Sequence, residues 1–118
     1  MPAPQIVETI HGIAISDLIA EREKDPRKAA ALARARRKIS GMIANEGSSI
    51  ASLRLSKGMS QQQLANAMGV KQPYIARIER GEDVKISTVT GLASALGEST
   101  DVVFRAMENM LKTKERIE

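Results

Sequence analysis

Residues 59–81, MSQQQLANAMGVKQPYIARIERG, contain two short helical patterns separated by a glycine. Ser60 followed three residues later by Gln63 forms a capping box, in which each side chain satisfies a backbone N–H at the start of a helix. Gly69 stands where this helix must end, because glycine adopts the left-handed backbone of a helix stop without steric cost. A second pattern opens near Gln72. The segment therefore predicts two helices joined by a tight turn, a helix-turn-helix.

The two predicted helices each have an apolar and a polar side. The apolar positions recur at helical spacing and are expected to face inward: Leu64, Ala65, Met68, Ile75 and Ile78. The second helix leaves a polar and basic set outside: Lys71, Gln72, Tyr74, Ala76, Arg77 and Arg80. An exposed helix fits the major groove of DNA, where Gln pairs with adenine and Arg with guanine through two hydrogen bonds. Gln72 and Arg77 are therefore predicted to contact bases.

The segment from about Ser49 to Leu96 resembles the Xre family of DNA-binding domains, which includes the phage repressors and Cro. The residues that stand in the family order are Arg54, Gly58, Ser60, Gln61, Leu64, Ala65, Gly69, Ile75, Ile78, Glu79 and Gly81. The resemblance implies an ion pair between Arg54 and Glu79, which orients the second helix of the motif. It also implies that Gln61, Gln72 and Arg77 contact DNA. Pro73 and Ala76 cannot donate side-chain hydrogen bonds, so we expect a narrow contact set.

Phosphate contacts are expected around the motif, because such contacts fix the register of a protein on the duplex. The candidates are Arg54, Lys57, Gln61, Lys71, Tyr74 and Arg80. Two of them have an alternative interpretation: Tyr74 as a partly packed ring and Lys57 as a solvated lysine. We expect a homodimer that binds a palindromic operator on double-stranded DNA at two successive major-groove faces and represses transcription by occupancy.

Composition agrees with a nucleic-acid partner and argues against other classes. The 118 residues carry a formal net charge of +4, which suits phosphate partners. Cysteine is absent and His11 is the single histidine, so no thiolate site, metal site or cofactor site is expected, and the chain is not expected to be an enzyme. The apolar stretches are too short to span a bilayer. We expect a cytoplasmic, nucleoid-associated protein without a membrane partner.

The expected fold class is all-α, with a five-helix repressor-like helix-turn-helix domain over residues 48–118 and a helical N-terminal extension over residues 1–47. Caps and stops flank the motif: Ser48 or Ser49 before its first helix, Gly58 after it, Ser87 and Gly97 around a fourth helix, and Ser99, Thr100 or Asp101 before the last. No strand is needed in the core. Because the apolar face of the last helix outruns this small core, a dimer contact is expected there from Phe104, Met107, Met110 and Leu111.

The N-terminal extension divides into an arm, a short helix and a basic helix. The arm, Gln5–Ile15, has no helical face, and a flexible arm, a strand added to a partner's sheet and a disordered tail all remain open. Ser16 caps the short helix, which runs to Lys24. The basic helix, from Pro26 to about Ala44, is predicted to place Leu32, Ala35, Ile39, Met42 and Ile43 on one side and Arg34, Arg37 and Lys38 elsewhere. Its cations form either a solvated face or an extra phosphate contact.

The placement of Lys24, Asp25 and Pro26 ahead of an Xre-like domain also resembles antitoxins of the Hig-type toxin-antitoxin operons. This resemblance implies an alternative function, in which the protein neutralises a small ribonuclease toxin and represses its own operon. The same dipeptide has a local explanation, because an aspartate before a proline is a common helix start. A toxin partner is therefore a second hypothesis beside the plain regulator.

Overall fold

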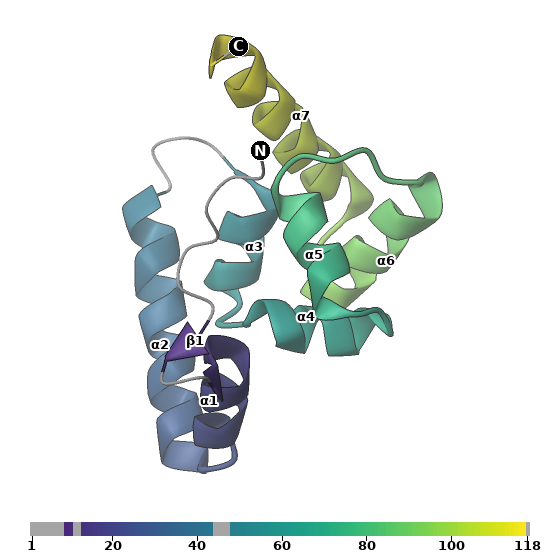
Figure 1. The fold of residues 1–118 in the computed structure, drawn as a ribbon. Coiled ribbons are helices and arrows are strands. Elements are labelled where there is room, and N and C mark those ends of the chain that lie inside the picture. Colours follow the sequence, from purple (N-terminus) through teal and green to yellow (C-terminus); the bar gives the residue numbers. More distant parts are fainter. Residues whose placement is uncertain (1–8, 11–12, 44–47, 118) are drawn as a thin grey trace. The chain divides into compact units, whose positions relative to one another are not determined.

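The computed structural model describes residues 9–10, 13–43 and 48–117, which contain seven helices and one pair of short strands (Figure 1). The chain divides into two compact units, residues 1–32 and 33–118. In chain order the elements are β1 (Thr9–Ile10), β2 (Ile13–Ala14), α1 (Ile15–Glu23), α2 (Pro26–Ile43), α3 (Ile50–Ser56), α4 (Gln61–Met68), α5 (Gln72–Glu79), α6 (Ile86–Leu96) and α7 (Thr100–Ile117).

The first unit holds a hairpin that the sequence patterns did not predict. β1 and β2 pair antiparallel, with Thr9 opposite Ala14 and Ile10 opposite Ile13. The described part of the predicted arm thus pairs with itself, while residues 5–8 and 11–12 lie outside the described residues. The predicted start of α2 is confirmed, because an Asp25 carboxylate oxygen accepts a hydrogen bond from the Arg27 backbone N–H at 2.9 Å.

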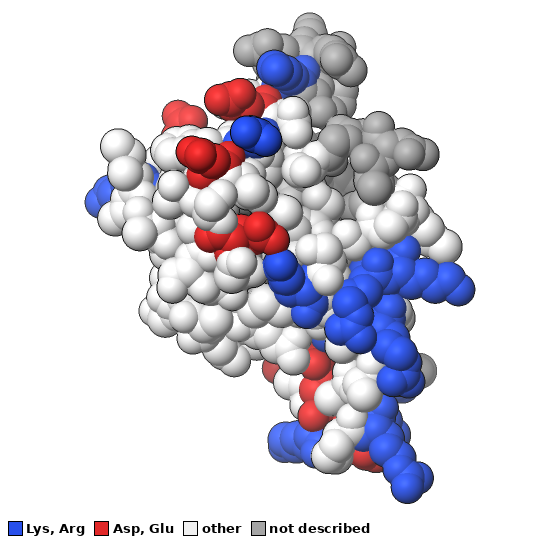
Figure 2. Space-filling view, turned by 180° about the vertical axis from the view of Figure 1, so that it is seen from behind, with Lys and Arg blue, Asp and Glu red and all other residues white. Residues whose placement is uncertain are grey.

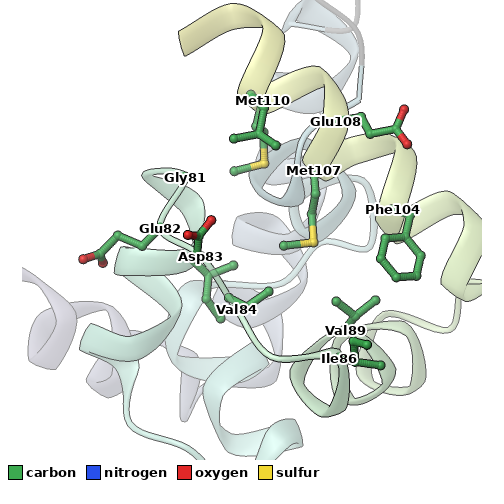
Figure 3. Close-up of a pocket in the computed structure, with 12 residues that line it drawn as sticks. Gly81, Glu82, Asp83, Val84, Ile86, Val89, Phe104, Met107, Glu108 and Met110 are labelled. Carbon is green, nitrogen blue, oxygen red and sulfur yellow. The ribbon is translucent and has the colours of Figure 1, made fainter. Parts of the chain in front are cut away.

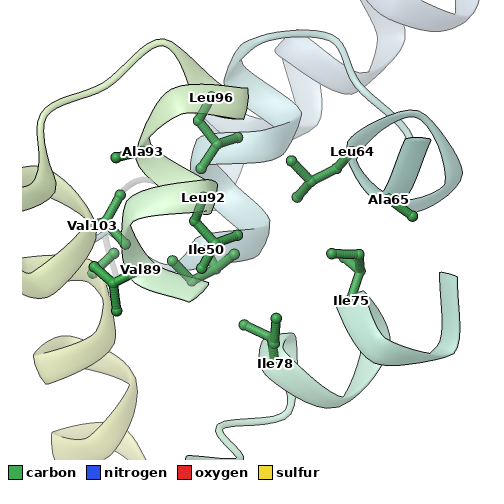
Figure 4. Packing of buried hydrophobic residues seen from close by; sticks show 11 residues of the cluster. Ile50, Leu64, Ala65, Ile75, Ile78, Val89, Leu92, Ala93, Leu96 and Val103 are labelled. Atoms are coloured by element: carbon green, nitrogen blue, oxygen red, sulfur yellow. The ribbon is translucent and has the colours of Figure 1, made fainter. Parts of the chain in front are cut away.

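The core of the second unit is built from helices alone, as predicted (Figure 4). Its largest fully buried side chains are aliphatic and come from α3 to α7: Ile50, Leu64, Ile75, Ile78, Leu92 and Val103. Burial of an aliphatic side chain of this size stabilises a fold by about 1.5–3 kcal/mol. These contacts hold α4 and α5 in place from their inner sides and leave their outer sides available.

The ends of the helices follow local chemistry in most places. At α4 the Ser60 hydroxyl accepts a hydrogen bond from the Gln63 N–H at 3.0 Å, and the Gln63 side chain accepts one from the Ser60 N–H at 2.8 Å. Gly69 ends α4 in the left-handed conformation with φ 69°. The cap predicted at Ser87 is wrong, because Lys85 is the N-cap of α6. Val84 packs against the core, and this contact brings the chain into α6 earlier than the serine alone indicates.

The second half of α2 belongs to the compact unit that contains α3 to α7. The Arg36 guanidinium donates hydrogen bonds to the Gly58 carbonyl at 3.2 Å and to the Gln63 side chain at 3.3 Å, and the Ser40 hydroxyl donates one to the Ser52 carbonyl at 3.0 Å. This compact unit starts at residue 33, within α2. The pattern could not indicate this, because each bond joins residues more than ten positions apart.

None of the described helices is both long and apolar enough to cross a membrane.

Candidate nucleic-acid interface

The two helices of the motif, α4 and α5, pack closely through small and aliphatic side chains. Ala65 and Ile75 are both 0% exposed. The turn between the helices is held by a hydrogen bond from the Val70 N–H to the Ala65 carbonyl at 3.0 Å. Ile75 and Ile78 place one side of α5 in the core, while Arg77 lies exposed on the other. This arrangement gives α5 the accessible polar side that a helix in the major groove requires.

A buried ion pair fixes the C-terminal end of α5. The Arg54 Nε atom lies 2.7 Å from Glu79 Oε2, and Arg54 Nη2 lies 3.0 Å from Glu79 Oε1. The third guanidinium nitrogen, Nη1, donates to the Met59 carbonyl at 2.8 Å. The two side chains are only 10% and 8% exposed, so the pair is a desolvated, two-pronged contact between α3 and α5.

The guanidinium of Arg54 has partners on every nitrogen within the protein. The phosphate contact of Arg54 stays a prediction, and it would require the side chain to leave a buried carboxylate. The sequence pattern could not separate the ion pair from a phosphate contact, since an arginine at this place suits both.

The carboxylate of Glu79 also orients two glutamines, and we call this set (Arg54, Gln61, Gln72 and Glu79) the glutamate network. Gln61 Nε2 donates to Glu79 Oε1 at 3.0 Å, and Gln72 Nε2 donates to Gln61 Oε1 at 2.6 Å. A carboxylate only accepts hydrogen bonds, so the Gln61 amide must turn its NH₂ toward Glu79 and its oxygen toward Gln72. The Gln72 amide keeps a second hydrogen and its oxygen for a partner outside this set.

The cations on the outer side of α5 are held weakly or not at all. Lys71, Arg77 and Arg80 are exposed. The Arg77 guanidinium lies 5.8 Å from the centroid of the Tyr74 ring, and its Nε lies 3.8 Å from a Glu82 carboxylate oxygen. An ion pair of that length between two exposed side chains contributes little, so Arg77 can exchange Glu82 for another anion.

Two other predicted phosphate contacts already have partners within the protein. The Tyr74 hydroxyl lies 3.0 Å from Thr88 Oγ1, which joins α5 to α6 and fits the interpretation of a partly packed ring. The Lys57 ammonium lies 2.7 Å from a Glu98 carboxylate oxygen, and both side chains are partly exposed. A phosphate contact by Lys57 therefore requires exchange of Glu98 for the phosphate.

The four residues of α7 that are predicted to form a dimer contact differ in exposure. Met107 and Met110 pack against the core, and the Ile50 N–H lies 3.4 Å from the Met110 sulfur. Phe104 is 45% exposed and Leu111 is 47% exposed.

A groove of about 220 Å³ runs along this face of α7, where Phe104 and Met107 face Val89 and Ile86 of α6 (Figure 3). Ile86, which sequence analysis missed, is 78% exposed at the edge of this groove. No sequence signal identified it, because an isoleucine at the start of a helix normally indicates core.

Arg36 is the second residue that sequence analysis missed. Its side chain is buried against the turn between α3 and α4, although it lies within a run of solvent-facing cations. The only signal in the sequence is that it lies on a different side of α2 from Arg34 and Lys38.

Comparison with known proteins agrees with this geometry. Residues 50–103, from α3 to the first turn of α7, match the helix-turn-helix family. An uncharacterised HTH-type transcriptional regulator of Haemophilus influenzae is 42% identical over 53 residues, which are 44% of this chain and 54% of that relative. The chain thus spans about half the length of this relative. Neither comparison bears on the resemblance to Hig-type antitoxins.

Proposed function

We propose that this protein is a sequence-specific DNA-binding transcriptional regulator that places α5 in the major groove. The observation that carries the proposal is the glutamate network, which holds the amide of Gln72 in one orientation at the start of an exposed helix. Base recognition needs donors and acceptors in fixed positions, and Gln72, which bonds to Gln61 while Gln61 bonds to the buried Glu79, meets that need. The match of residues 50–103 to the helix-turn-helix family supports the same proposal.

The proposed contacts follow from exposure and partners. Gln72 and Arg77 contact base edges, and Lys71 and Arg80 contact phosphates. The Gln61 side chain orients Gln72. Gln61 is also the first residue of α4, and the unpaired backbone N–H groups at this helix N-terminus favour a phosphate. Arg54 and Glu79 orient α5. Lys57 and Tyr74 bind phosphate only after they exchange their partners within the protein.

The proposed assembly is a homodimer that represses by occupying a palindromic operator. Two copies of α5 would enter successive major-groove faces about 34 Å apart. The supporting observation is the exposed apolar set on α6 and α7, Ile86, Phe104 and Leu111. Sedimentation at micromolar concentration should show a dimer, and Phe104→Asp should shift it to a monomer while Arg105→Ala should not. A wild-type monomer at that concentration would contradict this assembly.

The central test is selection of duplexes from a random library, followed by binding measurements on the selected site and its single-base variants. Arg77→Ala should reduce discrimination at one base pair by about 5- to 150-fold, which corresponds to roughly 1–3 kcal/mol. The control, Arg80→Ala, should weaken binding to every duplex alike and lower the slope of log affinity against log salt by about 0.9 for each protomer, or about 1.8 for the bound dimer. If no sequence is enriched, the proposed function is wrong.

The second candidate function is binding of a toxin, as the resemblance to Hig-type antitoxins implies. It is supported by two exposed apolar side chains on α2, Ile39 at 47% and Met42 at 68% exposed. Co-expression with the product of the neighbouring reading frame tests it. Co-purification that Met42→Asp abolishes would support this function. Separate elution of the two products would contradict it and leave the transcriptional regulator as the proposed function.

A further inference from the structure

We infer that the second half of α2 extends the DNA-binding surface, and that Arg34, Arg37 and Lys38, here called the basic segment, contact backbone phosphates beside the groove that α5 occupies. This inference rests on the proposed function and adds a second contact region to it. The partner is the same duplex, recognised by its charge and not by its bases.

The first observation is the charge of α2. Its 18 residues include no Asp or Glu and six of the chain's 18 Lys and Arg residues: Arg27, Lys28, Arg34, Arg36, Arg37 and Lys38. Figure 2 shows Lys and Arg side chains gathered on the part of the surface where α2 lies. All three residues of the basic segment are exposed, and none forms an ion pair with any residue in the described part of the chain. A solvated helix usually mixes both signs of charge in adjacent turns. A single sign fits a polyanionic partner better.

The second observation is how closely this part of α2 lies against the turn before α4. Gly58 has φ +74°, and a Cβ atom there would lie 3.0 Å from the Ala33 Cβ and 3.1 Å from the Ala33 carbonyl oxygen. Arg36 bonds to the Gly58 carbonyl and to Gln63 in the first turn of α4. These contacts place the backbone of this part of α2 directly on the turn, so the basic segment belongs to the same compact unit as α4.

The third observation is continuity between the basic segment and α5. The Arg37 guanidinium lies over Gly58, where Nη1 is 2.7 Å from the point that a Cβ atom on this glycine would occupy. Gly58 is two residues before Ser60, the N-cap of α4, and the next residue, Gln61, bonds to Gln72 at the start of α5. Arg37 of the basic segment thus lies close to the N-terminus of α4. The positive end of this helix dipole already favours a phosphate. Phosphates flanking the major groove are the partner that this strip of positive charge fits.

The experiment uses the full chain and measures affinity for the selected duplex, with flanks of about one helical turn on each side, at several salt concentrations. The double variant Arg34→Gln/Arg37→Gln should lower the slope of log affinity against log salt by about 1.8 for each protomer, or about 3.6 for the bound dimer, at 0.9 for each lost phosphate contact. Adding Lys38→Gln should lower it by about 1.8 more for the dimer. The order of preference among single-base variants of the site should not change.

The matched control is Arg105→Gln/Lys112→Gln, which removes the same charge from two exposed residues of α7. Its slope should equal that of the wild-type protein, and circular dichroism and sedimentation should show the same helix content and dimer for all variants. An equal fall in both double variants would overturn the inference, because net charge alone would then explain it. A wild-type slope in the Arg34→Gln/Arg37→Gln variant would also overturn it, with the proposed function intact. Failure of the wild-type chain to prefer any duplex would overturn both.

Discussion

Two helices of this protein, α5 and α2, carry exposed cations that are weakly held or have no partner among the described residues, but α5 also carries a polar side chain that the protein orients. α5 has eight residues, an apolar side in the core and, in Gln72, an amide held by the glutamate network. α2 has 18 residues, and its second half is attached through Arg36 and Ser40, while its exposed cations extend on long stems without partners in the described residues.

The difference separates two kinds of contact with a nucleic acid. A base edge demands a donor and an acceptor at fixed positions, and the fixed amide of Gln72 satisfies this demand. A phosphate can pair with a cation that approaches from many directions, so a flexible arginine or lysine is sufficient for a phosphate contact. The arrangement of partners, rather than the number of cations, therefore distinguishes the helix proposed to contact bases from the one proposed to contact phosphates.

The largest effect is expected from removal of the anchor of α5. Glu79→Ala leaves the Arg54 guanidinium buried without its carboxylate and frees the amide of Gln61. Loss of one partner of a buried ion pair costs about 3–5 kcal/mol, and urea denaturation measures the change in the free energy of unfolding. The control is Glu82→Ala, whose carboxylate lies 3.8 Å from Arg77 in an exposed pair and should cost less than about 0.5 kcal/mol. Equal losses for both variants would show that the network does not anchor α5.

A smaller effect is expected where α2 meets the turn before α4. Gly58→Ala and Gly69→Ala both force a left-handed residue, with φ +74° and +69°, which costs about 1–2 kcal/mol in each case. Only Gly58 faces the backbone of Ala33, at 3.1 Å, whereas nothing lies within 4 Å of a Cβ at Gly69. Thermal unfolding should therefore show an additional loss of about 1–3 kcal/mol for Gly58→Ala, the usual cost of overpacking. Equal melting temperatures would mean that α2 yields without cost.

The smallest effect is expected at Lys57, between these two regions in the chain. Its ammonium lies 2.7 Å from Glu98 in a partly exposed pair, so Lys57→Ala should change the free energy of unfolding by less than about 1 kcal/mol. Its effect on DNA binding shows whether the lysine exchanges partners. A salt slope lowered by about 1.8 for the bound dimer, 0.9 for each protomer, would support a phosphate contact. An unchanged slope would mean that Lys57 pairs only with Glu98.

Much of the architecture could be predicted from the sequence because its signals are local. The capping box at Ser60 and Gln63 and the stop at Gly69 act within one helical turn, and they define α4 as the structure shows it. Hydrophobic periodicity identified Leu64, Ile75 and Ile78 as core. The prediction at Ser87 was wrong, because α6 begins after Lys85, whose side chain makes no capping hydrogen bond, so no local capping signal marks this start.

Which side chains are exposed to a partner was harder to predict, because exposure depends on contacts between residues far apart in the sequence. Arg36 and Arg37 are adjacent cations in the sequence, yet one is buried and the other is exposed. Ile86 and Ile78 are both isoleucines in helices, yet one is 78% exposed and the other 1%. Residue type and periodicity could not distinguish the members of either pair.

By itself, the sequence determined the helical class, the limits of α4 and α5, and the polar character of the outer side of α5, since caps, glycine stops and periodicity operate between near neighbours. Only the tertiary structure decided that Arg54 forms a buried ion pair with Glu79 and that Gln61 bonds to both Glu79 and Gln72. It also decided that α2 lies against Gly58. These features join residues 11 to 25 positions apart or lie between separate helices. Such contacts form only when packing of the core brings the helices together.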